Sequence, residues 1–261
     1  MMRALATAAT GLEAQQLMVD VIANNLANVS TVGFKKSFAE FQDLMYQTAK
    51  APGTSTGIGL LPVGIQVGLG VRPVAVHRVF QQGSFQITNN SLDLAIEGDG
   101  FFQVTLANGS LAFTRAGSFK IDNEGRVVTA EGDLLTPNII VPDNTTTINV
   151  SAEGKVFAVT TGTPEPTELG TILLARFLNP AGLNSMGKNL LQATLASGAS
   201  IPGEPGLEGF GTIAQSRLEA SNVNIAEELV NMIVAQRAYE INSKAIQTAD
   251  EMIATVNNLK R

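Results

Sequence analysis

Few side chains in this 261-residue sequence could perform chemistry, and they are scattered. His77 is the only histidine and there is no cysteine, which leaves too few ligands for a zinc site and argues against a nucleophilic triad of the usual kind. The segment around His77 reads VRPVAVHRVF and predicts a strand. A lone histidine there favours a structural or exposed role.

Three carboxylates lie close together in the sequence, at Asp93, Glu97 and Asp99. Their spacing lacks the pattern of a calcium-binding loop, so turn and hairpin positions explain them better. Carboxylate pairs for glycoside hydrolysis are set in space rather than in sequence, but two Tyr and no Trp offer little aromatic surface for a sugar. The sequence therefore predicts no catalytic residue, no cofactor-binding residue, no metal site and no enzyme.

The composition narrows the classes of partner. Lys plus Arg number 17 and Asp plus Glu number 23, a net charge of −6. A mildly acidic chain is a poor default binder of nucleic acid or anionic membranes. We find no apolar run long enough to span a bilayer, and residues 1–16 lack the apolar core of a cleaved secretory signal. If the protein works outside the cytosol, we expect a different export route.

The stretch from Asn224 to about Leu259 predicts one long helix. It contains no Gly or Pro, and at about 1.5 Å per residue it would be about 54 Å long. One apolar stripe repeats every seven residues: Ile225, Met232, Tyr239, Ile246 and Ile253. A second stripe falls on roughly the opposite side: Val234, Ala238, Ile241, Ala245, Met252 and Leu259. Because packing on one core needs only one apolar stripe, the pattern predicts a helix between neighbouring subunits; the alternative is a helix buried in its own domain.

Residues 1–30 predict a second helix with two apolar faces. One set repeats every seven residues: Leu5, Leu12, Val19 and Leu26. A second set, three places on, completes this heptad pattern: Ala8, Gln15, Ile22 and Val29. The other face is formed by Ala14, Leu17, Met18 and Val21. Gly11 costs about 1 kcal/mol relative to Ala, so we expect this helix to be frayed or disordered in the free monomer and to end near Asn28–Ser30.

Residues 37–72 are expected to connect this helix to the middle of the chain. A short helix is predicted from about Ser37 to Lys50, with Phe38, Phe41, Leu44 and Met45 on one face. Residues 51–70 are rich in Gly, Ser, Thr and Pro, yet they are too apolar to stay solvated, with Leu60, Leu61, Val63, Ile65, Val67 and Leu69. Their alternation predicts an extended arm or long hairpin lying on a neighbour.

From residue 71 to about residue 211 the pattern becomes strand-like. Apolar segments flank Asn108–Gly109, the strongest short hairpin signal in the chain. Further hairpins are predicted around residues 123–125 and 153–154, and another strand over residues 171–178. Such closely spaced turns predict a mostly-β domain.

The predicted fold class is therefore α+β, with long N- and C-terminal helices paired antiparallel in a coiled-coil-like domain and a mostly-β domain inserted between them. The predicted domains are a terminal helical domain of residues 1–36 plus 217–261, a connecting segment of residues 37–72 with the apolar arm, and a β-rich outer domain of residues 73–216.

Several motifs carry a resemblance to a known family. Residues 23–37 read ANNLANVSTVGFKKS, and residues 218–252 contain SNV and QRAYE. The middle adds NNSLDLAIEGDGFFQV from Asn89, FTRAGSF from Phe113 and ASG from Ala196. Over nearly its whole length the sequence resembles the bacterial flagellar rod and hook family. Ser216 departs from the pattern, which has Gly there.

The resemblance implies a structural, non-enzymatic axial subunit of the flagellar basal body. Family members form a tube from their terminal helices, with the β-domain outside, and are exported unfolded by the flagellar type III apparatus. The length and the apolar segment 51–70 point to the distal rod, a rigid drive shaft crossing the periplasm and enclosing part of the export channel. Implied partners are further copies of this chain, proximal rod proteins, hook or hook-base subunits, a rod cap protein during assembly, and the surrounding P-ring and L-ring proteins, with no cofactor, nucleic acid or membrane insertion.

The residues expected at subunit contacts are those of the apolar stripes and the arm. They are Leu5, Leu12, Val19, Ile22, Leu26, Leu60, Val63, Ile65, Met232, Tyr239, Ile246 and Ile253. Two alternatives stay open: a proximal rod or hook subunit of the same family, and a monomeric β-domain enzyme or carbohydrate binder with a helical stalk.

Overall fold

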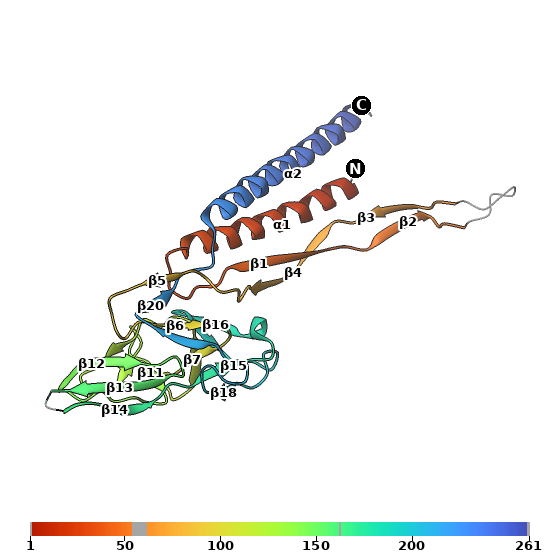
Figure 1. Cartoon of the computed structure of the whole chain (residues 1–261). Helices are drawn as coiled ribbons and strands as arrows, with labels where there is room; N and C mark the ends of the chain where they lie inside the picture. The colour runs from red at the N-terminus through yellow and green to blue at the C-terminus, as the bar shows by residue number, and fades with distance from the viewer. Residues whose placement is uncertain (1, 54–61, 162, 260–261) are drawn as a thin grey trace. The chain divides into compact units, whose positions relative to one another are not determined.

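The computed structural model describes residues 2–53, 62–161 and 163–259. The chain divides into two compact units, which Figure 1 shows in ribbon form. The first unit contains residues 1–27, 37–77 and 224–261, and the second contains residues 28–36 and 78–223. By contacts, residues 28–36 and 217–223 group with the β-rich unit, whereas the sequence-based domains assign them to the helices. The predicted α+β class is confirmed.

Two long helices dominate the first unit. The helices are α1 (Met2–Ala27) and α2 (Ile225–Leu259), close to their predicted bounds. They run antiparallel, because Gly11 of α1 faces Asn242 of α2 and Asn25 contacts Glu228. The predicted antiparallel pairing is confirmed.

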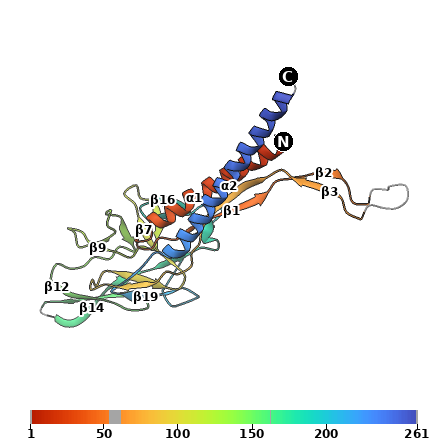
Figure 2. The ribbon, with the colours of Figure 1, turned by 90° about the horizontal axis from the view of Figure 1, so that it is seen from above.

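The rest of the first unit is extended chain. Its strands are β1 (Ser37–Asp43), β2 (Tyr46–Lys50), β3 (Ile65–Gly68) and β4 (Val71–Arg78), the last of which ends one residue into the second unit. Strand β1 pairs with β4, and β2 pairs antiparallel with β3 in a long hairpin. Figure 2 shows this hairpin, which we call the arm, from above. The hairpin predicted for this region is confirmed over its described residues.

The helix predicted over residues 37–50 is wrong, because β1 and β2 occupy that segment. Its buried position is Ala39, with Phe41 partly buried, whereas Phe38 and Glu40 are exposed. This alternation is the period of a strand. The long-range pairing with β4 overrides the weak helical spacing of the aromatic residues.

The second unit is built almost entirely from short strands. They are β5 (Phe85–Ile87), β6 (Leu94–Glu97), β7 (Phe101–Thr105), β8 (Leu111–Thr114), β9 (Lys120–Ile121), β10 (Val127–Val128), β11 (Leu134–Thr136), β12 (Thr145–Val150), β13 (Lys155–Thr160), β14 (Thr163–Thr171), β15 (Leu174–Arg176), β16 (Asn184–Gly187), β17 (Leu190–Gln192), β18 (Ile201–Gly203), β19 (Thr212–Gln215) and β20 (Arg217–Glu219). A single 3₁₀ turn, Pro180–Gly182, interrupts the strands of the described part of this unit. The predicted mostly-β middle is confirmed.

The largest sheet has nine strands in the order β16-β17-β8-β7-β11-β10-β9, with β15 and β18 attached beside β7. Strands β12, β13 and β14 form a second sheet, and β19 pairs with β6 and β20 with β5. The three hairpins predicted from turn residues are the pairs β7–β8, β9–β10 and β12–β13. The strand predicted over residues 171–178 is shorter, at Leu174–Arg176.

Two apolar clusters form the core of this unit. The larger one is built around Phe102, Phe119, Leu135, Ile139 and Leu174, all almost completely buried. The smaller one contains Phe101, Phe113, Ala175, Phe177, Leu183 and Leu191. The aromatic rings meet edge to face, as Phe113 and Phe177 do at 4.8 Å between centroids, a favoured geometry for such rings.

Candidate assembly surface and polar centre

The two helices of the first unit approach closely at Gly11. A Cβ atom at this position would lie 2.9 Å from Nδ2 of Asn242. The glycine therefore gives room for a polar side chain of α2 against the backbone of α1. The sequence argument counted only its helix-breaking cost and missed this packing role.

Most of the predicted assembly residues are at least partly buried within the chain. Ile22 is buried, and seven others are partly buried: Leu5, Leu12, Val19, Leu26, Met232, Ile246 and Ile253. Val19 and Tyr239 line one groove of about 400 Å³ between the helices, together with Gln16, Gln236 and Glu240. The apolar stripes of the two helices are thus partly covered within the first unit.

A second face of α2 is left exposed by the described residues of the first unit. Val234 is 62% exposed and Ile241 is 66% exposed, and Val230, Ile233 and Met252 are also exposed. Val230, Val234, Ile241 and Met252 lie on one stripe of the helix at 3.6 residues per turn. The sequence placed Val234, Ile241 and Met252 on this opposite stripe, but Val230 and Ile233 were missed because they fall outside the strict heptads.

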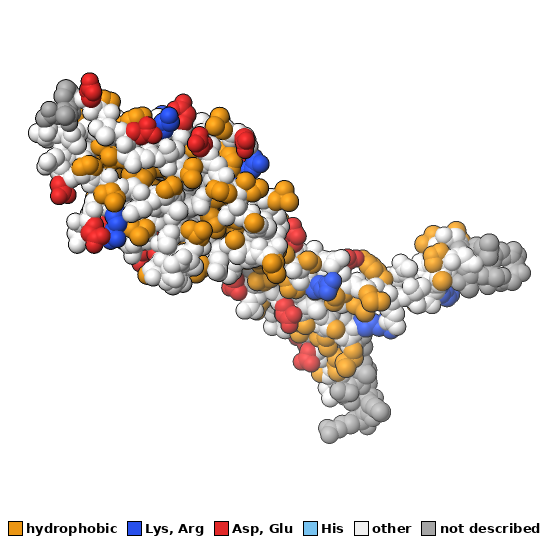
Figure 3. All heavy atoms as spheres, turned by 90° about the horizontal axis from the view of Figure 1, so that it is seen from below, with side chains coloured by type: hydrophobic (Ala, Val, Ile, Leu, Met, Phe, Trp, Pro, Cys, Tyr) orange, Lys and Arg blue, Asp and Glu red, His pale blue; other side chains and the backbone are white. Residues whose placement is uncertain are grey.

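The arm is another exposed apolar surface. Its exposed residues include Met45, Tyr46, Val63, Ile65 and Val67. Figure 3 shows hydrophobic side chains gathered on the arm beside the grey residues. Val63 and Ile65 are therefore exposed, as an assembly role requires, whereas Leu60 and Leu61 lie outside the described residues.

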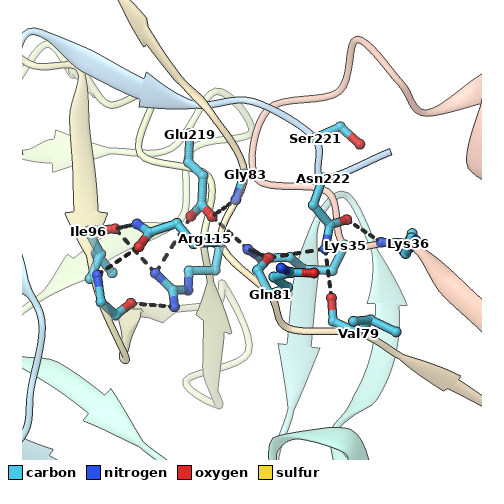
Figure 4. A network of polar contacts seen from close by, with 12 residues as sticks. Lys35, Lys36, Val79, Gln81, Gly83, Ile96, Arg115, Glu219, Ser221 and Asn222 are labelled. Atoms are coloured by element: carbon cyan, nitrogen blue, oxygen red, sulfur yellow. Dashed lines mark hydrogen bonds and ion pairs between the residues drawn. The ribbon is translucent and has the colours of Figure 1, made fainter. Parts of the chain in front are cut away.

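The second unit holds three buried charged residues, Lys35, Arg115 and Glu219, next to the partly buried Asn222. We call these four residues the polar centre (Figure 4). Nζ of Lys35 donates to Oε1 of Glu219 at 2.6 Å. Nη1 of Arg115 lies 3.6 Å from Oε2 of the same carboxylate. The Lys35 and Glu219 side chains are 2% and 0% exposed, so this is a fully desolvated ion cluster.

Main-chain groups complete the polar centre. The Gly83 amide donates to Oε1 of Glu219 at 2.9 Å, and Lys35 also donates to the Gln81 carbonyl at 2.7 Å. Nη2 of Arg115 donates to the Gly98 carbonyl at 2.7 Å. These bonds meet part of the hydrogen-bonding capacity of the buried charges. Nε of Arg115 and Oε2 of Glu219 have no hydrogen-bond partner within the described residues.

Asn222 ties three segments of the second unit together. Its Oδ1 accepts from the Lys36 amide at 2.7 Å, and its Nδ2 donates to the carbonyls of Val79 and Gln81. The Gly33 amide donates to the Glu219 carbonyl at 2.8 Å. Residues 33–36, 79–83 and 219–222, far apart in sequence, are held side by side by these bonds.

Burial perturbs both cations of the polar centre. Desolvation lowers the pKa of Lys35 from its usual value, against the opposing attraction of Glu219. Desolvation likewise lowers the pKa of Arg115, again opposed by Glu219. The carboxylate of Glu219 is therefore what makes two buried positive charges tolerable.

A related polar contact fixes the first unit. The side chain of Asn25 accepts from the Ser37 amide at 2.8 Å and donates to the Ser37 carbonyl at 2.9 Å. Its Nδ2 also lies 3.3 Å from Oε2 of Glu228, in the first turn of α2. One buried asparagine thus connects the end of α1 to the starts of β1 and α2.

His77, Asp93 and Glu97 each have a structural partner. Nδ1 of His77 lies 3.5 Å from Oε1 of Glu40, and its ring packs near Phe38. Asp93 accepts from Nδ2 of Asn90, and Glu97 pairs with Arg217. Within residues 2–53, 62–161 and 163–259, no three acidic or histidine side chains are grouped to hold a metal ion. No helix in the described part of the chain is long and apolar enough to cross a membrane.

Comparison with known proteins finds matches to several segments of the chain. Three family models match: flagella basal body rod protein over residues 5–35, flagellar hook protein FlgE/F/G D1 domain over residues 95–158, and flagellar basal body rod FlgEFG protein C-terminal over residues 214–259. The flagellar basal-body rod protein FlgG of Borreliella burgdorferi is 54% identical, with all of both chains covered. The chain belongs to the flagellar rod and hook family. Lys35 lies in the first match and Glu219 and Asn222 in the last, so these distant matched segments meet at the polar centre.

Two further relatives compare this chain with a rod protein and with a hook protein. FlgG of Buchnera aphidicola from Acyrthosiphon pisum is 51% identical over 96% of each chain. The flagellar hook protein FlgE of Escherichia coli K12 is 25% identical over an alignment of 418 positions, covering 98% of this chain and all of the hook protein. The rod proteins thus align nearly end to end, whereas the hook protein has long additional segments. The predicted family and the structural, non-enzymatic role are confirmed.

Proposed function

We propose that this chain is a structural subunit of the flagellar distal rod, which assembles with further copies into a rigid tubular drive shaft. The tube transmits torque from the motor to the hook and encloses part of the export channel. The observation that carries this proposal is the second apolar face of α2, because Val230, Val234 and Ile241 are left exposed by the described residues of their own unit.

Burial of that face drives assembly. Apolar surface removed from water contributes about 25 cal/mol per Å², and a helical polymer repeats the same contact at every subunit. The apolar arm adds a second contact of the same kind, through Val63 and Ile65. Because each contact is packed rather than flexible, the tube resists shear when it turns.

The proposed environment follows from this role. The partners are proximal rod proteins on one side, hook or hook-base subunits on the other, a rod cap protein during assembly, and the P-ring and L-ring proteins around the shaft. The chain works in the periplasm after export by the flagellar type III system. The three predicted domains then correspond to an axial tube, a bracing arm and an outer body.

A test separates assembly from folding. Val234→Asp places a charge on the uncovered face, and Tyr239→Asp and Ile246→Asp place one on the stripe that meets α1. We expect all three to leave the second unit folded, as measured by calorimetry, and to abolish rod assembly in cells. Gln247→Asp, at an exposed polar position of the same helix, is the matched control and should assemble. Normal rods built from Val234→Asp would contradict the proposal.

Location is tested independently by a small tag in the exposed turn at Asn108–Gly109. Electron microscopy of isolated basal bodies should show the label on the shaft between the outer rings and the hook base. Label along the curved hook, or near the inner membrane alone, would refute the distal-rod assignment.

A further inference from the structure

The second unit carries two leucines that are exposed rather than buried. Leu195 is fully exposed, and Leu178 is 93% exposed. The two are neighbours, because the side chain of Asn179 donates to the Ala196 carbonyl at 3.1 Å and the Asn179 amide donates to the Ser197 carbonyl. Leu178 and Leu195 are thus two exposed apolar side chains on adjoining segments, and we call this pair the knob.

The turn that carries Leu195 is unusually well fixed. The Thr194 amide donates to Oγ of Ser197 at 2.9 Å, and the Ala196 and Ser197 amides both donate to Oγ1 of Thr194. Oγ1 of Thr194 in turn donates to the Gly182 carbonyl at 2.6 Å. A Cβ at Gly182 would lie 2.7 Å from the main chain of this turn, so the turn is seated against residue 182. Fixing a turn before binding reduces the entropy cost of association, and these bonds hold the main chain that carries Leu195 in a defined position.

The opposite edge of the same sheet borders a hollow with both apolar and polar lining residues. The knob follows β17, next to the edge strand β16, whereas Ile121 lies in β9, the strand at the other edge. Ile121, Val141, Pro142 and Ile148 line a hollow of about 530 Å³ there, together with polar residues that include Thr145–Thr147. Residues of β12 border the hollow. Figure 1 shows β12 and β16 toward opposite ends of the second unit.

The charges beside the two surfaces are also complementary. Arg176 borders the pocket that Leu178 lines, and its Nη1 donates to the Glu208 carbonyl. Asp143 borders the hollow and is exposed, with no ion pair within the described part of the chain. An arginine on one side and an unpaired carboxylate on the other favour contact between them.

We propose that the knob of one copy inserts into the hollow of the next copy, so that outer units are joined head to tail. A projection on one edge and its receptor on the opposite edge make a heterologous contact, which repeats in an open polymer instead of closing as a dimer. The inference rests on the proposed rod function, because it supplies an outer contact to a polymer whose axial contact is made by α2.

The absence of cysteine from the chain allows a direct test. In cells that produce only the Leu195→Cys/Asp143→Cys variant, each subunit carries one thiol on the knob and one at the hollow. Treatment of isolated basal bodies with a short bifunctional thiol reagent should give a ladder of joined chains on a denaturing gel. Each single variant should stay monomeric. Leu111→Cys/Asp143→Cys is the matched control, because Leu111 is an exposed leucine on the interior strand β8.

The outcomes of this experiment distinguish a failure of the knob-in-hollow contact from a failure of the proposed rod function. Rods that form without a ladder would overturn the knob-in-hollow contact and leave the rod function standing. Dimers from Leu195→Cys alone would also overturn it, because knobs would then meet knobs. A chain that is absent from basal bodies altogether would overturn the proposed function, and the inference with it.

A second variant, Leu195→Asp, tests the same contact without a cross-linking reagent. Leu195→Asp should leave the melting temperature of the free chain unchanged, because the side chain is fully exposed. The fraction of the chain recovered in basal bodies should fall about tenfold or more, as for loss of an interface anchor. Leu111→Asp should assemble normally. Wild-type recovery of Leu195→Asp would refute the contact.

Discussion

Removing the charge of Glu219 should unfold the second unit at a much lower temperature. In Glu219→Gln, Lys35 and Arg115 remain buried without a counter-ion, although the cluster is 0–4% exposed. Breaking a buried pair from one side costs about 3–5 kcal/mol. The second unit has about 155 residues, and for that size 1 kcal/mol shifts the melting temperature by about 2–4 °C. The expected decrease is therefore roughly 6–20 °C.

Scanning calorimetry of the full-length chain measures this decrease. Both tyrosines of the sequence, Tyr46 and Tyr239, lie in the first unit, so tyrosine fluorescence reports separately whether the helices and the arm are affected. We expect the calorimetric transition of the second unit to move and the tyrosine signal to keep its wild-type midpoint.

The deficit should also depend on pH. Burial already lowers the pKa of Lys35, and Glu219 opposes that decrease, so the variant lowers it further. Between the folded and unfolded pKa values the unfolded chain binds more protons, and stability rises with pH in that window. The deficit of Glu219→Gln should therefore narrow as the pH rises toward the usual pKa of lysine, while Arg115 stays charged.

Glu97→Gln is the matched control, because Glu97 pairs with Arg217 at 3.2 Å with both side chains about 45% exposed. Exposed pairs contribute about 0–1 kcal/mol, so this variant should melt within roughly 4 °C of the wild type. If Glu219→Gln melts no lower than Glu97→Gln, the reasoning that assigns the cost to buried cations is refuted.

Three further changes test local geometry. Gly33→Ala should destabilise the second unit by about 2 kcal/mol or more, because its φ is +68° and a Cβ would lie 2.6 Å from the main chain. Gly109 is the control, since its φ is +80° but there is open space around it. Gly109→Ala should cost only about 1 kcal/mol in the same calorimetric assay. Ser216→Gly should stabilise the unit by about 1 kcal/mol, since Ser216 holds a φ of +57°, and an unchanged or lower melting temperature would argue against relief of strain. The hydrogen bond from Arg126 lowers the pKa of Asp122. Its contribution to stability is therefore present above the unfolded pKa and is lost as the pH falls through the folded pKa. In Asp122→Asn the melting temperature should depend less on pH on the acid side, and a wild-type pH dependence would contradict this.

Local patterns were enough to predict the helices and the hairpins. The seven-residue repeats gave α1 and α2 because helical periodicity is a property of adjacent turns. Asn108–Gly109 gave the β7–β8 hairpin because the turn type depends on the turn residues themselves. The segment 37–50 was mispredicted because its strand state depends on β4 and on the Asn25 side chain, which are distant in sequence.

The site was predictable only in part for the same reason. The helix stripes showed which residues are apolar, but not that Ile22 and Met232 are used within the chain while Val234 and Ile241 stay uncovered. Nothing in the spacing of Lys35 and Glu219, 184 positions apart, indicates that they pair. The available signal was a lysine and a glutamate within the motifs of the family resemblance, next to glycine and asparagine residues.

Part of the motifs that identify this family is therefore internal to the subunit. Lys35, Glu219 and Asn222 are polar and internal, and they fix the path of the chain where residues 33–36 and 219–222 meet within the second unit. A buried charge network stabilises only when every member is in place, so this junction forms as a whole or costs several kcal/mol. Apolar contacts such as those proposed for Val234 and Leu195 tolerate change of shape far better. It follows that substitutions at the polar centre should act through folding of the subunit, whereas substitutions on the uncovered face of α2 should act through assembly of a normally folded one.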